Sequence, residues 1–270
     1  MEEYELAESI GFGSFSIVYK AKRRGENDNF VAIKIAKIEI EHEEDHQETC
    51  DRILVYDRKR IEREIDLWKP LNHDNLCRLL HVFIDEKEGK VSFVMEYVKD
   101  GDLLTLLSEK GLKEDKIKEI FKQLCSAVEY LHDCDLVHGD IKLENILVNG
   151  DEIKLSDFGL ARKILAGEKD SNFNCGTVEY AAPELLQNDS VEVPFKADIW
   201  SLGVVLYSLL YRRFPFDGPT PKVLKIRVLT SEPIYTEIEG NSELVKLVKK
   251  LLNKNPLNRP SIKEIINFLI

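Results

Sequence analysis

The sequence predicts an α+β protein with two lobes of different class. Its first third alternates strand-like segments with turn signals, whereas the remainder carries apolar residues at helical spacing. Strands gathered in one region and helices in another are typical of an α+β architecture. We expect an amino-terminal lobe at about residues 1–97 and a carboxyl-terminal lobe at about 98–270, within a single domain covering residues 4–270.

The first expected strands lie between residues 4 and 35. Alternation over residues 30–35 places Ala32 and Lys34 on one face of a strand and Val31, Ile33 and Ile35 on the other. Two more apolar segments, near residues 79–84 and 91–98, extend the strand-rich region. Between them the pattern turns helical.

The first expected helix covers residues 58–69, where Ile61, Ile65 and Trp68 share one face before Pro70 ends the pattern. Residues after 101 are mainly helical. Other helices are expected at about residues 197–211 and at the carboxyl end, finishing at residue 270. A long buried stripe at helical spacing consists of Ile117, Phe121, Leu124, Val128 and Leu131.

The composition is that of an ordinary soluble globular protein: 270 residues, 43% hydrophobic and 32% charged. A formal net charge of −11 argues against nucleic-acid binding as the main activity, because a phosphate backbone is bound by cations. An acidic balance suits a basic peptide substrate, although a solvated acidic surface is the simpler explanation.

The five cysteines form no Cys-x-x-Cys pair, which favours a reduced intracellular protein. We expect it in the cytoplasm, with the nucleus as the alternative. The acidic start of the chain lacks the apolar stretch of a secretory signal. The longest apolar run, around residues 202–210, is about half a membrane span, so we expect a buried helix and no membrane insertion. We also expect a monomer.

The most informative motif begins at residue 138 and reads His-Gly-Asp-Ile-Lys-Leu-Glu-Asn, with Asp-Phe-Gly twelve residues later. It supplies a carboxylate base (Asp140), a cation (Lys142), an amide (Asn145) and a second carboxylate (Asp157). Phosphoryl transfer from Mg-ATP needs a base, a cation on the moving phosphate and oxygen ligands for the metal. The segment resembles the catalytic loop and metal-binding motif of eukaryotic protein kinases.

Two earlier motifs extend this resemblance. A glycine-rich turn at residues 11–18 is weak alone, and Ser16 replaces its usual third glycine. It is strengthened by the Val-Ala-Ile-Lys that ends at Lys34, which resembles the kinase lysine that grips the α- and β-phosphates. Glu64 is the expected partner of this lysine. Glu62 competes for that role but falls on the outer side of its helix.

The resemblance implies a role for each matching residue. Asp140 would orient the substrate hydroxyl, Lys142 would stabilise the γ-phosphoryl group, and Asn145 and Asp157 would hold magnesium. Lysine at position 142 is typical of serine/threonine kinases, and His138 is expected to pack. The implied ATP site consists of Ile10, Gly11, Phe12, Gly13, Ser14, Phe15, Val18, Ala32, Lys34, Glu64, Glu96, Val98 and Leu147.

Residues 175–184, Cys-Gly-Thr-Val-Glu-Tyr-Ala-Ala-Pro-Glu, resemble the end of a kinase activation segment. Thr177 matches the threonine that contacts the catalytic aspartate and lysine in serine/threonine kinases. Glu184 has an expected partner in Arg259, and Asp198 resembles the carboxylate that anchors the catalytic-loop backbone. These last roles are structural.

The resemblance implies a two-lobed kinase fold, with a five-stranded antiparallel sheet and a regulatory helix before a mainly helical lobe. It implies a non-specific serine/threonine protein kinase (EC 2.7.11.1 class) that uses ATP and Mg²⁺. Residues 142–145 and 180–183 are most similar to the calmodulin-dependent and AMP-activated group, near fungal polarity, microtubule-affinity-regulating and checkpoint kinases. Asp102 and Glu144 match acidic positions that favour basic residues before the phosphoacceptor.

The sequence departs from the family at the activation segment. Gly139 stands where most members carry an arginine that pairs with a phosphorylated loop. Residues 161–174 contain one hydroxyl residue, Ser171, and Phe173 occupies the position where close relatives place a threonine. Both the phosphate acceptor and its receiving cation are missing, so we predict activity without activation-loop phosphorylation.

Two other departures leave alternatives open. The acidic residues 38–57 make the span before Glu64 roughly ten positions longer than in a compact kinase. His42 and His46 within it match a metal-binding spacing, but a solvated acidic loop is favoured. Trp68 replaces a smaller aliphatic residue and would either complete the interior or push its helix outward.

Two rival functions remain. A pseudokinase scaffold that binds ATP without transfer is suggested by Gly139, Ser16 and Trp68, but the intact catalytic set opposes it. A small-molecule phosphotransferase is opposed by the activation segment. A regulatory partner for the helix bearing Glu64 is left open.

Overall fold

A computed structural model describes residues 3–13, 16–25, 29–38, 58–109, 111–164, 176–187, 193–236 and 243–270. The chain divides into two compact units, one made of Met1–Asn72 and Cys77–Val98, the other of His73–Leu76 and Lys99–Ile270. The described part of the first unit is a sheet with one helix, and that of the second is mainly helical. The predicted α+β class is therefore confirmed.

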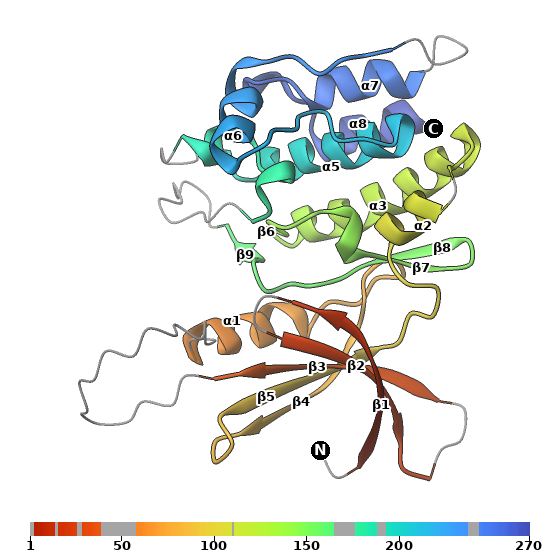
Figure 1. Ribbon diagram of the computed structural model, residues 1–270, viewed down its shortest axis with the longest axis vertical. Coiled ribbons are helices and arrows are strands. Elements are labelled where there is room, and N and C mark those ends of the chain that lie inside the picture. The colour runs from red at the N-terminus through yellow and green to blue at the C-terminus, as the bar shows by residue number, and fades with distance from the viewer. Residues whose placement is uncertain are drawn as a thin grey trace, which may run out of the picture. The chain divides into compact units, whose positions relative to one another are not determined.

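The first unit contains a five-stranded antiparallel sheet in the order β1-β2-β3-β5-β4 (Figure 1). On one face of the central strand β3, Ile33 packs with Tyr4, Ala21 and Val94. On the other face Lys34 lies opposite Phe93 of β5. The strands are β1 (Tyr4–Phe12), β2 (Ser16–Arg23), β3 (Phe30–Lys37), β4 (Leu79–Asp85) and β5 (Lys90–Glu96).

Helix α1 (Arg58–Trp68) packs on the sheet face that carries Lys34 and Phe93. Trp68 is 1% exposed, stacks on Phe93 with ring centroids 6.2 Å apart, and donates from Nε1 to the Cys77 carbonyl at 2.7 Å. A buried indole with its N–H satisfied is a stable arrangement. Trp68 therefore lies inside the unit, which answers the question that the sequence left open.

The second unit is built around α5 (Phe195–Tyr211), which is buried along most of its length and lies between α3 and α7 (Figure 1). The helical stripe predicted within residues 117–131 is buried in α3. None of the helices in the described part of the chain is long and apolar enough to cross a bilayer. The other helices are α2 (Leu103–Glu109), α3 (Glu114–Asp133), α4 (Pro183–Leu186), α6 (Pro221–Thr230), α7 (Glu243–Leu251) and α8 (Ile262–Leu269).

Two short antiparallel strand pairs carry the loops with the predicted catalytic residues. β6 (Leu136–Val137) pairs with β9 (Arg162–Lys163), and β7 (Ile146–Asn149) pairs with β8 (Glu152–Leu155). Residues 138–145 connect β6 to β7 and end in a 3₁₀ turn, Leu143–Asn145. Residues 156–161 connect β8 to β9. Further 3₁₀ turns cover Val178–Tyr180 and Pro256–Asn258.

Candidate active site

Lys34 forms a buried ion pair within the first unit. Its Nζ lies 3.2 Å from Glu64 Oε1, and the two side chains are 8% and 1% exposed. Glu64 is on the inward face of α1, whereas Glu62 is exposed and pairs with Arg58 at 3.2 Å. The helical period therefore separates the two candidate glutamates, because residues two apart face different sides of a helix.

The turn between β1 and β2 is tightened by a hydrogen bond from Gly13 N to the Ser16 carbonyl at 2.8 Å. Phe12 is 78% exposed on this turn. Ser14 and Phe15, predicted to bind ATP, lie outside the described residues. Among the other predicted pocket residues of this unit, Ile10 is exposed, Gly11, Val18 and Glu96 are half-buried, and Ala32 and Val98 are buried.

In the second unit the catalytic loop gathers Asp140, Lys142 and Asn145. Lys142 Nζ donates to Asp140 Oδ2 at 2.6 Å. Asn145 Nδ2 donates to the Asp140 carbonyl at 2.8 Å and to Oδ2 at 3.1 Å. These bonds hold the Asp140 carboxylate in one orientation, which a group that must align a substrate hydroxyl requires.

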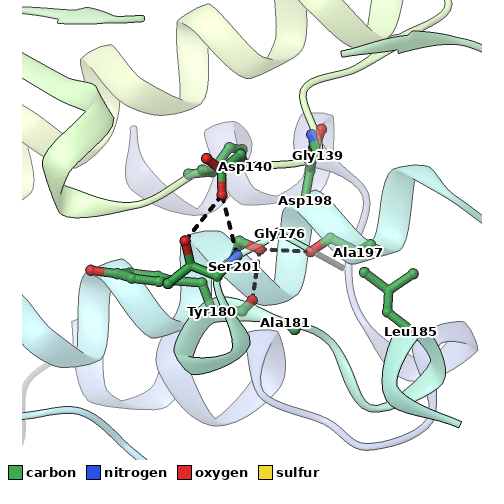
Figure 2. A pocket seen from close by; sticks show the side chains of 11 residues that line it. Gly139, Asp140, Gly176, Tyr180, Ala181, Leu185, Ala197, Asp198 and Ser201 are labelled. Atoms are coloured by element: carbon green, nitrogen blue, oxygen red, sulfur yellow. Dashed lines mark hydrogen bonds between the residues drawn. The ribbon is translucent and has the colours of Figure 1, made fainter. Parts of the chain in front are cut away.

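Thr177 joins this loop to the end of the activation segment. Lys142 Nζ donates to Thr177 Oγ1 at 3.1 Å, and the Thr177 hydroxyl donates to Asp140 Oδ1 at 3.4 Å. The residue that the sequence matched to a serine/threonine kinase position thus contacts both predicted catalytic side chains. Figure 2 shows Asp140 with its hydrogen bonds to this segment.

Asp157, after β8, adopts a positive φ of 64° and accepts from Gly159 N at 3.4 Å. Because Asn145 uses its amide nitrogen on Asp140, its carbonyl oxygen is the atom suited to a metal ion. No cluster of three or more histidine, cysteine or acidic residues suited to a metal occurs within the described ranges. Asn145 and Asp157 each offer a side-chain oxygen, the kind of ligand with which proteins hold Mg²⁺ beside substrate phosphates.

Asp198, 1% exposed at the start of α5, anchors the catalytic loop. Its carboxylate accepts from His138 N at 2.9 Å and Gly139 N at 3.0 Å, and Oδ2 lies 3.0 Å from His132 Nε2. Burial alone would raise the pKa of Asp198, but these hydrogen bonds and the neighbouring histidines hold that pKa below its usual range. The carboxylate therefore stays charged and orients the loop backbone.

His138 is fully buried and serves packing. Its Nε2 lies 3.2 Å from the Ser156 carbonyl, and its ring meets Phe158 edge-on. Burial lowers the pKa of His138 from its ordinary value, so the imidazole is neutral at pH 7. Such a ring suits the packing role expected for it from the sequence.

Arg259 and Glu184 form a two-pronged ion pair, with Nη1 and Nη2 each 2.7 Å from a Glu184 oxygen. The Arg259 guanidinium also donates to the carbonyls of Asn253, Lys196 and Lys254. It is 0% exposed, which makes this a structural anchor between α4 and the carboxyl-terminal helices.

Sequence reasoning missed the role of Tyr180. Its hydroxyl donates to Glu144 Oε2 at 3.0 Å and accepts from Leu143 N at 3.3 Å. Burial, followed by the Glu144 charge, raises the pKa of Tyr180, so its hydroxyl keeps the proton it donates. The signal available was the tyrosine inside the matched segment 175–184, but its partner is 36 positions away in the chain.

With this geometry in hand, comparison with known proteins decides the family. The sequence matches the protein kinase domain over residues 4–268. The chain belongs to the protein kinase family. The fold and the order of the motifs in this kinase domain agree with that assignment.

Curated relatives cover almost all of this kinase chain. It is 37% identical over 265 residues to NUAK family SNF1-like kinase 2 of Homo sapiens, covering 97% of the chain and 39% of that protein. It is 35% identical to the rat serine/threonine-protein kinase SIK1 (97% and 32%) and 36% identical to the rice CBL-interacting protein kinase 12 (98% and 46%). The chain thus spans less than half the length of these relatives. They are AMP-activated-kinase-related, which confirms the predicted branch.

Proposed function

We propose that the protein transfers the γ-phosphoryl group of Mg-ATP to serine and threonine hydroxyls of protein substrates, as one kinase domain covering residues 4–270. The contact of Thr177 with both Asp140 and Lys142 carries this proposal. It supports an assembled phosphoacceptor site with a base and a cation side by side. Phosphoryl transfer depends mainly on such positioning and electrostatic stabilisation.

Each residue of the site has a separate role in the transfer. The Asp140 carboxylate accepts the hydrogen bond of the substrate hydroxyl, and Lys142 places a positive charge at the phosphoryl group in transit. Lys34, which is held by Glu64, contacts the nucleotide phosphates. Asn145 and Asp157 would supply oxygens for magnesium, which would neutralise phosphate charge when bound.

The decisive experiment incubates the protein with labelled ATP, magnesium and a mixed peptide array, beside an Asp157→Ala variant. Transfer to serine or threonine peptides that disappears in the variant is the expected result. ATP binding without transfer by the wild-type protein would select the scaffold instead. Transfer to small metabolites alone, in a parallel reaction that offers them in place of the array, would select a small-molecule phosphotransferase.

We further propose a preference for basic residues before the phosphoacceptor. Glu144 is held by Tyr180, and Asp102 Oδ1 accepts from Thr105 N at 2.8 Å at the start of α2. A carboxylate accepts several hydrogen bonds, so each side chain can also receive a substrate cation. A peptide library should show arginine or lysine enrichment that Glu144→Gln reduces and the exposed control Glu152→Gln leaves unchanged. A profile without basic enrichment would remove this proposal.

Independence from activation-loop phosphorylation is also proposed, and Gly139 supports it because it cannot pair with a phosphate. Ser171 and Phe173 lie outside the described residues. Full activity of protein without phosphate on Ser171 is expected, and strict dependence on an upstream kinase would contradict it. The insert 38–57, with His42 and His46, also lies outside the described ranges.

We propose an intracellular protein, in the cytoplasm or the nucleus, that acts as a monomer on protein substrates. Support comes from Cys125 and Cys134, which are free thiols among the residues that the structure describes. Sedimentation of the purified protein at working concentration should give the mass of one chain.

A further inference from the structure

Gly139 is locked into its conformation by the backbone of the segment that follows Asp-Phe-Gly. Its φ is +77°, and a Cβ added there would lie 2.9 Å from the Leu160 carbonyl oxygen. Carbon atoms of side chains do not approach backbone oxygen that closely, so the backbone of this chain would have to shift to admit a side chain at position 139. The atom in the way is backbone, which cannot rotate aside as a side chain does.

Hydrogen bonds hold the backbone next to the Leu160 carbonyl. Ala161 N donates to the Phe158 carbonyl at 2.9 Å, and Ile164 N donates to the Asp135 carbonyl at 2.8 Å. Between them β9 pairs with β6, which ends two residues before Gly139. The close approach is therefore built into a hydrogen-bonded strand pair.

A second glycine places the other end of the activation segment against the same leucine. A Cβ added to Gly176 would lie 2.5 Å from Asp140 Oδ1 and 3.2 Å from Leu160 Cδ1. Leu160 thus meets Gly139 through its carbonyl and Gly176 through its side chain. The close approach of Leu160 to Gly139, and of Gly176 to Asp140, leaves no room for a Cβ at either glycine.

The space beside this junction is small. Gly139, Asp140, Gly176 and Ser201 line a cavity of about 10 Å³ (Figure 2). That volume holds about one water molecule.

We propose that Leu160, seated between Gly139 and Gly176, holds the activation segment on the catalytic loop and thereby positions Asp140 without a phosphate. Gly139 and Leu160 are positioning residues, because they act through Asp140 and Thr177. The inference rests on the proposed kinase activity and explains how that activity proceeds without a phosphorylated loop.

The test compares Gly139→Ala, Gly139→Arg and Leu160→Ala with a matched glycine control in the full chain. Gly150→Ala is that control, because Gly150 also has a positive φ (+63°) but no atom within 4 Å of an added Cβ. Turnover and the KM for ATP are measured with a peptide substrate. Hydrogen exchange of residues 160–164 is followed in parallel.

Each position 139 variant should lower kcat by about 10- to 100-fold with an unchanged KM for ATP, because a small misplacement of a catalytic group has effects of this order. Exchange over residues 160–164 should accelerate. Leu160→Ala, which adds no atoms, should lower kcat without changing the KM for ATP, and Gly150→Ala should change neither readout.

Wild-type kcat together with wild-type exchange in Gly139→Ala, or full turnover in Gly139→Arg or Leu160→Ala, would overturn the inference. If the wild-type protein transfers no phosphate, the proposed function fails. Comparing the hydrogen exchange of Gly139→Ala with that of Gly150→Ala would still test the contact between Gly139 and Leu160. Should Gly139→Ala fail to fold, Leu160→Ala decides the question through its kcat.

Discussion

Two buried ion pairs, one in each unit, differ in how firmly the cation is held. In the second unit the Arg259 guanidinium contacts both oxygens of Glu184 and three backbone carbonyls. In the first unit Lys34 Nζ lies 3.2 Å from one oxygen of Glu64. Arginine presents a rigid planar fork, whereas a lysine ammonium is a compact point charge on a flexible stem.

This difference matches the proposed roles of the two cations. A guanidinium surrounded by protein acceptors stabilises the fold and has no N–H group left for a ligand. A lysine ammonium carries three N–H donors on a flexible stem, so it can pair with a carboxylate and also donate to phosphates. The comparison therefore separates a pair that stabilises the fold from one that serves phosphoryl transfer, and variants can test that separation.

The largest effect is expected from Arg259→Met. Loss of one partner leaves Glu184 charged without its cation and removes three hydrogen bonds to backbone carbonyls, so the free energy of unfolding should fall by about 3–5 kcal/mol. Adding Glu184→Gln should not restore it, because the hydrogen bonds to the carbonyls stay lost. Urea and thermal unfolding measure this, with a melting temperature lower by about 10 °C. The exposed Arg213 serves as control through Arg213→Met, and a wild-type stability of Arg259→Met would break the comparison.

The next effect concerns activity. In Lys34→Met/Glu64→Gln both charges are removed together, so the free energy of unfolding should stay within about 1 kcal/mol of wild type. Phosphoryl transfer should fall by about 100-fold or more, because a preorganised charge on the phosphates is lost. Steady-state kinetics and unfolding are measured on the same preparation, beside the exposed control Lys37→Met. A loss of stability as large as that of Arg259→Met would contradict the proposed difference between the two ion pairs.

Trp68→Phe tests how much an uncharged contact, that of Trp68 in α1, contributes to stability beside the two ion pairs. Phenylalanine keeps the stacking on Phe93 but removes the hydrogen bond to the Cys77 carbonyl, at a cost of about 1–3 kcal/mol. Chemical denaturation measures the change. An unaltered stability would show that this bond does not secure the helix.

The pH dependence of stability should reside in the second unit. Burial lowers the pKa of His138 and of His73, so below about pH 6.5 the unfolded chain binds protons that the native protein does not. The free energy of unfolding should therefore decrease as the pH falls from 7 to 5. The depressed pKa of Asp198 adds a further loss below about pH 4. Urea titrations at several pH values should give a shallower slope for His138→Gln, and an unchanged slope would exclude His138 as a source.

The smallest effect is expected from Glu62→Gln. Glu62 pairs with Arg58 on the exposed side of α1, and exposed pairs contribute less than about 1 kcal/mol. Stability and turnover should match the wild-type protein. A loss of activity comparable to that of the Lys34/Glu64 variant would mean that the wrong glutamate has been assigned.

Much of the fold followed from local patterns in the sequence. The alternation over residues 30–35 and the stripe from Ile117 to Leu131 predicted β3 and α3, because strand and helix periods are properties of short segments. The helical period also distinguished Glu64 from Glu62. Trp68 could not be placed from the sequence, because its position depends on Phe93 and Cys77, which lie in other elements.

The sequence by itself determined the chemical set, since Asp140, Lys142 and Asn145 lie within six consecutive positions and are brought together by one loop. It also identified Gly139 as the departure from the family. The tertiary structure alone decided what surrounds that glycine, because Leu160 and Gly176 are distant in the chain and meet it through contacts that depend on a missing Cβ. The spacing of residues along a chain shows which side chains are present. Whether two backbone segments approach closely depends on how those segments pack in the folded protein.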